Sequence, residues 1–408
     1  MIYARNLPEP PPNRFLAKFA LIFTMAGAAS LANQDAVLFT VAALVAVLAS
    51  FGSLRSVSLP AAAVALSLLL FTYGISDGVG YTPVLITIAT GLMACLAGAN
   101  ITKSGISYLT TIVALVAGMT VHAALNLWLL LARYGLRPET RQVDDIWTMS
   151  ALAATAHAAF WTPLVGLLPF LFVWRRRGQG AFAALVLIGA VFLAASLLAS
   201  RTLALLLMFV VFGWLLASRY FSSGGPRRTG ASSVVMGTLG VVGVGVAWVA
   251  PGALSELPLF ARLATPEGSL GDDPRIARWA AYSTRGWEHF WGGGHLKMEI
   301  GYAHSLWLDV LDAAGIPAFI CVVAFSALFL TSALSIARSQ SFSVGERVAT
   351  AGLAVSCTAQ AATEPLLEGM PVVFVVMCAL AGAMAATLES RRTQRVGATR
   401  RDSGWALH

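Results

Sequence analysis

Charged side chains are scarce in this sequence. Asp, Glu, Lys and Arg together make up 11% of its 408 residues, whereas hydrophobic residues make up 58% and the mean hydropathy is +0.76. Soluble domains carry about 25% charged residues, so this chain has too little polar surface to fold alone in water. The composition excludes a soluble enzyme and a disordered chain, and it favours an integral membrane protein.

Cysteine is also rare. The four cysteines, Cys95, Cys321, Cys357 and Cys378, all lie within apolar runs, and no spacing pairs them as in a disulfide framework or a zinc site. We interpret them as small buried hydrophobic residues. Histidines and carboxylates at metal-ligand spacing are missing as well, so the sequence predicts neither a metal nor a cofactor.

Long apolar runs take the place of the alternating pattern that outer-membrane strands require. A transmembrane helix needs about 17–25 mostly apolar residues, and the sequence predicts an all-α integral membrane protein with about 12 such helices. The first is followed at once by another and lacks a small-residue cleavage site, so we interpret it as a retained helix. The predicted spans are residues 15–31, 36–51, 59–75, 84–99, 108–131, 151–174, 181–198, 202–217, 231–250, 305–334, 349–366 and 370–388.

The distribution of Lys and Arg predicts the orientation, because cytoplasmic loops are rich in these residues. With the N-terminus in the cytoplasm, that side receives 18 of the 27 basic residues but only four of the 19 acidic ones. Both termini are then cytoplasmic, and the pI of 9.7 needs no nucleic-acid partner. The predicted organisation is nine helices in residues 1–250, a loop with short helices on the non-cytoplasmic side in 251–304, three helices in 305–390 and a basic tail in 391–408.

Arg201 lies between two apolar runs that leave no room for a long loop, so we place it at the membrane boundary on the non-cytoplasmic side. An Arg there can form a forked pair of hydrogen bonds with a phosphate or a carboxylate. The alternative is a helix-end Arg that snorkels to the interface.

The long loop at 251–304 contains Arg275, Arg278, Trp279 and Arg285 at near-helical spacing. One helix face would then present a row of guanidinium groups beside an aromatic ring. Such a face suits a diphosphate, and the aromatic suits a sugar ring. A solvated basic face would show the same spacing.

A glycine-rich stretch, Gly292–Gly294, follows and predicts a flexible hinge; it lacks the strands of a dinucleotide-binding loop. His304 then opens a long apolar helix. A neutral His can accept a proton from a hydroxyl group, although a His at a helix start is often structural. Asp309 and Asp312 lie five and eight residues beyond it, and neither has the ideal spacing for a partner.

Glu364 and Glu368 lie in the last predicted helical hairpin, on the same side of the membrane as the long loop. They could orient a base, bind sugar hydroxyls or mark the turn. His122, Asn126 and His157 lie within apolar spans, where we expect them to pack between helices. His289 and His295 are interpreted as loop residues.

Taken together, these features resemble the O-antigen ligase and O-antigen polymerase superfamily of polytopic envelope glycosyltransferases. The resemblance covers roughly residues 180–390 and rests on the order and spacing of its parts. Ser305 stands where the family often has Asn, and the loop is compact for the family. The parts are Ser200-Arg201, one large periplasmic loop, Arg275-x-x-Arg278-Trp279, Gly292–Gly294, His304-Ser-x-x-Leu308 running into Ala314-Gly315-Ile316, and Glu364-Pro365 before a last helix.

The resemblance implies a GT-C-like enzyme of the bacterial inner membrane with a periplasmic active site. Its donor would be a glycan on undecaprenyl diphosphate, and its acceptor a sugar hydroxyl of lipid A–core in ligases or of another lipid-linked glycan in polymerases. His304 would be the general base of a metal-independent, inverting transfer. Arg201, Arg275 and Arg278 would bind the diphosphate, and the candidate sugar or acceptor contacts are Trp279, Arg285, Glu364 and Glu368.

Two rival functions remain open at this stage. A lipid-linked oligosaccharide flippase or other transporter would share the many helices, but it should place charges near the bilayer midplane of several helices. A cell-wall glycan polymerase of the shape–elongation–division type also uses a lipid diphosphate, but we can assign no counterpart to its catalytic Asp. Within the O-antigen superfamily, the sequence does not distinguish ligation from polymerisation, because both reactions use the same donor-binding residues.

Overall fold

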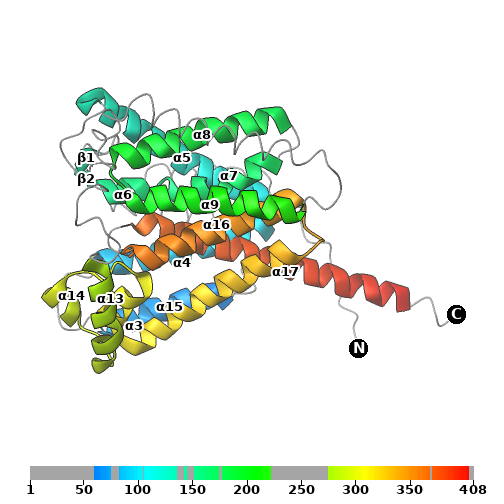
Figure 1. The fold of residues 1–408 in the computed structure, drawn as a ribbon. Coiled ribbons are helices and arrows are strands. Elements are labelled where there is room, and N and C mark those ends of the chain that lie inside the picture. Colours follow the sequence, from blue (N-terminus) through cyan, green and yellow to red (C-terminus); the bar gives the residue numbers. More distant parts are fainter. Residues whose placement is uncertain are drawn as a thin grey trace, which may run out of the picture.

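The computed structural model shows a bundle of long helices with two short helices at one end (Figure 1). The structure describes residues 59–74, 82–103, 105–135, 142–144, 151–173, 177–221, 274–367 and 370–403. The long helices are α3 (Leu59–Gly74), α4 (Thr82–Lys103), α5 (Tyr108–Tyr134), α7 (Thr162–Val173), α8 (Arg177–Leu197), α9 (Arg201–Phe221), α15 (Leu306–Arg338), α16 (Val344–Thr363) and α17 (Pro371–Ser403). The shorter elements are β1 (Gln142–Asp144), β2 (Ala151–Ala153), α6 (Ala154–Ala159), α13 (Pro274–Arg285), η6 (Gly286–Glu288) and α14 (His295–Ile300), and β1 pairs antiparallel with β2.

Six of the described helices are long and apolar enough to cross a membrane, which agrees with the predicted helical membrane protein. They are Val84–Lys103, Tyr108–Tyr134, Ala156–Val173, Gln179–Leu197, Leu306–Arg338 and Pro371–Thr393. Leu59–Leu70 and Arg201–Trp214 are shorter apolar helices, and α16, at the predicted span 349–366, is not among the six. The predicted spans 15–31, 36–51 and 231–250 lie outside the described residues, so the predicted total of 12 is not tested.

Two predicted spans differ in detail from the observed helices. The span 151–174 starts with the short strand β2, and a turn at Phe160 and Trp161 separates α6 from α7. The span 305–334 continues to Arg338, and two helical segments meet at Gly315, whose φ of 78° is left-handed. Hydropathy alone does not reveal either interruption, because the residues on both sides of each are apolar.

Small residues let the central helices approach closely. A Cβ atom on Gly98 of α4 would collide with the carbonyl oxygen of Ala379 in α17, and one on Gly382 of α17 would collide with that of Cys95 in α4. Gly166 of α7 and Gly352 of α16 are in the same situation against each other. Close backbone contact of this kind is typical of helix packing in membranes, where association depends on van der Waals contact.

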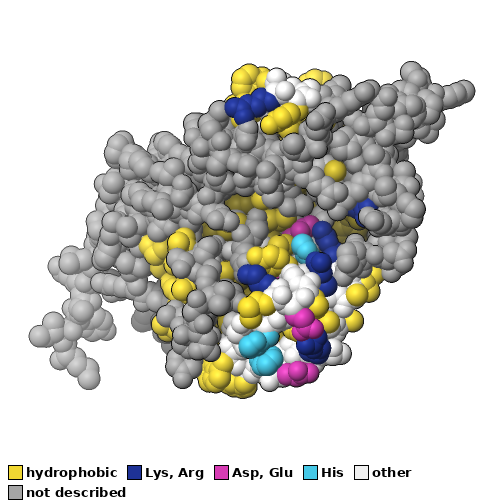
Figure 2. Space-filling model, turned by 90° about the vertical axis from the view of Figure 1, so that its left-hand side faces the viewer, with side chains coloured by type: hydrophobic (Ala, Val, Ile, Leu, Met, Phe, Trp, Pro, Cys, Tyr) yellow, Lys and Arg dark blue, Asp and Glu magenta, His cyan; other side chains and the backbone are white. Residues whose placement is uncertain are grey.

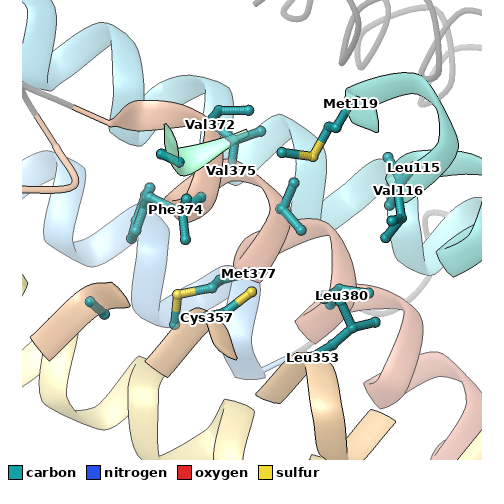
Figure 3. Close-up of a cluster of buried hydrophobic side chains, with 14 of the residues drawn as sticks. Leu115, Val116, Met119, Leu353, Cys357, Val372, Phe374, Val375, Met377 and Leu380 are labelled. Carbon is teal, nitrogen blue, oxygen red and sulfur yellow. The ribbon is translucent and has the colours of Figure 1, made fainter. Parts of the chain in front are cut away.

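The core lies where α5, α16 and α17 meet. Figure 3 shows Met119 of α5, Cys357 of α16 and Met377 of α17 among other apolar side chains of these helices, and all three are fully buried. All four cysteines are buried, as the sequence predicted. Helices α9, α15 and α16 therefore share one continuous apolar core, whereas α13 belongs to a second, smaller cluster formed by Tyr282, Leu296 and Ala303.

Charged side chains also form contacts at the end of the bundle opposite α13 and α14. The last part of α17 extends beyond the other helices at the end opposite α13 and α14 (Figure 1). There Arg391 lies over the Phe342 ring at 4.1 Å and donates a hydrogen bond to the Ser341 carbonyl, and Lys103 pairs with Glu389 at 3.2 Å. The basic tail thus begins as a helix that contacts the α15–α16 loop.

The glycine-rich stretch packs against the bend of α15. Three backbone hydrogen bonds of 2.9 to 3.2 Å join residues 290–294 to residues 312–316. A Cβ atom on Gly292 would lie 2.6 Å from the backbone nitrogens of Ala314 and Gly315. The prediction of a flexible hinge is therefore wrong: Gly292 packs against the backbone of α15, Gly292 to Gly294 all have positive φ, and the hydrogen bonds fix the position of the stretch.

Candidate functional site

Arg201 begins α9, directly after a tight turn from α8. Ala199 in this turn has a left-handed φ of 48°, and the Ser200 hydroxyl accepts a hydrogen bond of 3.3 Å from the Leu203 amide, which caps the helix. The next residue, Thr202, donates a hydrogen bond of 2.8 Å to the Glu364 carboxylate. The predicted short connection is confirmed, and it brings the start of α9 beside Glu364.

Glu364 is the residue at which three segments meet. It caps the C-terminus of α16, and its side chain is only 3% exposed. Besides Thr202, the carboxylate contacts Arg275 of α13, whose Nη2 lies 3.5 Å from Oε1, while Nη1 donates to the Thr363 carbonyl at 3.3 Å. A buried carboxylate is costly unless it is paired and hydrogen-bonded, and these neighbours supply that compensation.

His304 approaches the same carboxylate from another segment. Its Nδ1 lies 3.8 Å from Glu364 Oε2, so the two form an ion pair when the imidazole is protonated. This Nδ1 is buried and has no hydrogen-bond partner among the residues that the structure describes, whereas the side chain as a whole is 26% exposed. The geometry leaves Nε2 as the ring nitrogen that can accept a proton from a neighbouring group.

The backbone of His304 is unusual, and Asp309 holds it. His304 has a φ of 57°, in the left-handed region that residues other than glycine seldom adopt. Asp309 Oδ1 accepts from the Ala303 amide at 2.9 Å and Oδ2 from the Ser305 amide at 3.1 Å. One carboxylate, in the first turn of α15, therefore accepts hydrogen bonds from the backbone amides of the residues before and after His304.

Helix α13 holds the preceding segment, residues 301–303, by three side chains. Tyr282, which is fully buried, donates to the Gly301 carbonyl at 2.8 Å. Arg278 donates to the Tyr302 carbonyl at 3.4 Å, and Trp279 Nε1 donates to the Ala303 carbonyl at 2.6 Å. Two of the predicted site residues thus position the segment that leads into His304.

Arg285 lies at the other end of α13, about 15 Å from Arg275 at 1.5 Å of rise per residue. It forms a forked pair with Glu299 of α14, with N···O distances of 2.6 and 3.0 Å. The hydrogen bond from Arg285 lowers the pKa of Glu299, and the same bond raises the pKa of Arg285. The predicted row of guanidinium groups is therefore divided, because only Arg275 and Arg278 contact the His304 region.

A small open cleft lies beside this cluster. It is mostly apolar and open to solvent, and the space of about 280 Å³ that it borders includes part of that open solvent. Tyr302 and Asp309, which flank His304, and Pro365, which follows Glu364, are among its lining residues. Figure 2 shows this end of the molecule, where basic, acidic and histidine side chains gather beside hydrophobic ones. The cleft thus places an apolar surface next to the polar cluster around Glu364.

Of the other predicted positions, three are confirmed as buried residues, and one lies outside the described residues. His122, Asn126 and His157 are fully buried, as predicted, and the rings of both histidines lie near Phe160. Glu368 lies outside the described residues. Among the residues that the structure describes, no three His, Cys, Asp or Glu side chains are grouped as metal ligands would be.

Sequence reasoning missed two members of the cluster. Asp309 was considered only as a helical partner of the His304 side chain, whereas it binds the backbone on either side of that residue. Thr202 follows Arg201 directly, and no local pattern predicts its hydrogen bond to Glu364. An Asp in the first turn of a helix is a general sign of amide capping and could have identified the first of these.

No family model matches this chain, and no curated protein matches it. The fold and the site therefore define the class of protein by themselves. The chain is a helical protein, several of whose helices can cross a membrane, with a polar cluster at one end of the bundle.

Proposed function

We propose that this protein is a membrane glycosyltransferase of the O-antigen ligase type. It moves a glycan from undecaprenyl diphosphate to a sugar hydroxyl at the periplasmic face of the bacterial inner membrane. The observation that carries the proposal is the convergence of Thr202, Arg275, His304 and Glu364, from four segments, at one end of the helices. Burying ionisable groups in a membrane protein costs free energy. A cluster of them, such as this one, therefore favours a functional role.

The donor diphosphate is bound by Arg201, Arg275 and Arg278 in this proposal. Arg275 is 25% exposed, and its bonds to Thr363 and Glu364 are long, at 3.3 and 3.5 Å. A phosphate oxygen that offers shorter, charge-assisted hydrogen bonds competes well for such a guanidinium. The adjacent apolar cleft gives the site the mixed polarity that an amphipathic donor requires.

The transfer is a direct displacement at the anomeric carbon. The acceptor hydroxyl oxygen attacks that carbon while the carbon–oxygen bond to the diphosphate breaks, and the lipid diphosphate leaves with the electron pair. His304 takes the hydroxyl proton at Nε2, and the resulting imidazolium faces Glu364 through Nδ1. Guanidinium groups compensate the charge that develops on the leaving group. The anomeric configuration inverts.

The acceptor decides between a ligase and a polymerase of the same superfamily, because both use the same donor. The test is a reconstitution of purified protein with an undecaprenyl-diphosphate glycan in EDTA, with and without lipid A–core. One glycan block joined to lipid A–core identifies a ligase, and a ladder that forms without this acceptor identifies a polymerase. Glycolipid movement across liposomes without any transfer would replace the proposal with a flippase.

Variants make this test specific to the cluster. His304→Ala should abolish transfer, and Arg275→Lys should fail nearly as badly as Arg275→Ala, because Lys cannot form a forked pair with phosphate. Arg391→Ala is the matched control, since Arg391 contacts Phe342 at the opposite end of the bundle. Full activity of Arg275→Lys, or activity lost in EDTA and restored only by a divalent ion, would contradict the proposed mechanism.

A further inference from the structure

An exposed aromatic surface lies between the two polar helices α13 and α14. It is formed by Trp287, Phe290 and Trp291, whose exposed fractions are 47%, 53% and 48%. The rings of Phe290 and Trp291 contact each other edge to face at 4.9 Å. Three large aromatic side chains on one exposed turn form an apolar patch of the kind that marks an interaction site. We call it the aromatic turn.

The aromatic turn is joined to α15 at the bend of that helix. The Trp287 ring contacts Phe319 edge to face at 5.2 Å. The Phe290 carbonyl accepts a hydrogen bond of 3.0 Å from the Ile316 amide, immediately after Gly315. These two contacts therefore fix the position of the aromatic turn along the axis of α15.

Beyond this bend, α15 exposes a stripe of large apolar side chains. Ile320, Val323, Leu330 and Leu334 are 58%, 40%, 41% and 46% exposed, and their spacing of three, seven and four residues places them on one side of the helix. Because α15 is one of the six described helices that are long and apolar enough to cross a membrane, this exposed stripe is suited to contact lipid. The aromatic turn lies at the end of the stripe.

The neighbours of the aromatic turn on its other side are polar. His289 and His295 stack at 4.2 Å between ring centroids, and Arg285 pairs with Glu299 on the exposed surface. An apolar stripe, an aromatic turn and a charged surface thus follow one another over a short distance. Trp residues concentrate at this kind of boundary in membrane proteins, because the indole is apolar with a polar N–H.

We infer that the aromatic turn rests in the headgroup region of a phospholipid bilayer, in the leaflet on the side of the His304 cluster. It fixes the depth of α13 and α14, which lie just outside the membrane, and so the height of His304 above the lipid. The partner surface is the bilayer itself, because the turn continues the exposed apolar stripe of α15. This inference does not depend on the proposed transferase activity.

The experiment uses the purified full chain in vesicles whose phospholipids carry bromine high on the acyl chain, a quencher of tryptophan fluorescence. The double variant Trp287→Phe, Trp291→Phe should lose more of the bromolipid quenching than the share of two among 11 tryptophans. Trp161→Phe is the control, because Trp161 is 1% exposed and its removal should leave the quenching unchanged.

A water-soluble quencher, acrylamide, gives the opposing readout. If the double variant keeps the full bromolipid quenching and loses acrylamide quenching instead, the aromatic turn faces water and the inference is wrong. Loss of neither component would mean that the two side chains are covered by protein, which also overturns it. Circular dichroism of each variant verifies that the helices are retained.

Discussion

The sharpest prediction concerns Asp309 and the backbone of His304. Asp309→Asn keeps the size of the side chain but replaces one of the two accepting oxygens with an NH₂ group, which can only donate. One of the amides of Ala303 and Ser305 then loses its acceptor. Because His304 is held at a φ of 57°, the segment can relax toward an extended backbone, and the imidazole should move away from Glu364.

The expected size of the effect follows from the hydrogen bonds. A hydrogen bond to a charged group contributes about 1.5–3 kcal/mol, and holding a residue other than glycine in the left-handed region costs roughly 1–2 kcal/mol. Losing one bond is therefore enough to release the strained backbone. A loss of about 1.4 kcal/mol in transition-state stabilisation lowers the rate tenfold, so kcat for glycan transfer should fall by about tenfold or more, with little change in KM for the donor.

Asp312 provides a matched control on the same helix. It is 4% exposed and accepts hydrogen bonds of 2.9 Å from the amides of both Leu296 and Lys297, at the start of α14. Asp312→Asn should cost a comparable free energy of unfolding, but residues 301–303 keep their bonds to α13. Transfer per folded molecule should therefore stay near the wild-type rate.

Two measurements separate positioning from general destabilisation. The first is kcat and KM for each variant, normalised to folded protein. The second is the NMR signal of ¹³Cε1-labelled histidine, in which the His304 resonance, assigned with His304→Gln, should shift in Asp309→Asn and not in Asp312→Asn. Wild-type kcat and an unshifted His304 resonance in Asp309→Asn, or an equal loss of kcat in both variants, would refute the reasoning. The NMR result holds even if the protein is not a transferase.

Three further predictions concern packing and charge. Gly315→Ala should lower the free energy of unfolding by about 3 kcal/mol or more in detergent, because its φ is left-handed and its Cβ would collide with the Phe290 carbonyl. Gly189→Ala, where a Cβ meets nothing within 4 Å, should be neutral or slightly stabilising; equal losses in both would contradict the packing. Gly382→Ala should separate α17 from α4 and lower the thermal midpoint, since its Cβ would meet the Cys95 carbonyl. The lowered pKa of Glu299 means that its pair with Arg285 stabilises the protein at neutral pH and is lost as the pH falls through that pKa. The difference in thermal midpoint between wild type and Glu299→Gln should therefore shrink in acid and in high salt, and a difference that grows in acid would be inconsistent with the pair.

Hydropathy was a reliable guide to the helices, because a segment that lies in lipid must be apolar over most of its length. The predicted spans 84–99 and 108–131 coincide with α4 and α5. Hydropathy failed where the backbone changes direction inside an apolar run, as at Phe160 and at Gly315. Those bends depend on contacts with other segments, such as the hydrogen bonds between residues 290–294 and 312–316.

The sequence by itself determined the class of protein and the residue types available for chemistry. A charged fraction of 11%, the long apolar runs and the short connection before Arg201 are all visible without coordinates. Local spacing also indicated that residues 275–285 form a helix, and α13 confirms it.

Only the tertiary structure decided which of those residues meet. Thr202 and Glu364 are 162 positions apart and share a hydrogen bond, and Arg275 reaches the same carboxylate from a third segment. The structure also separated Arg285 from Arg275 and made Asp309 a backbone clamp beside His304. Periodicity describes neighbours along one helix, whereas these contacts arise from how α9, α13, α15 and α16 pack, which no local pattern contains.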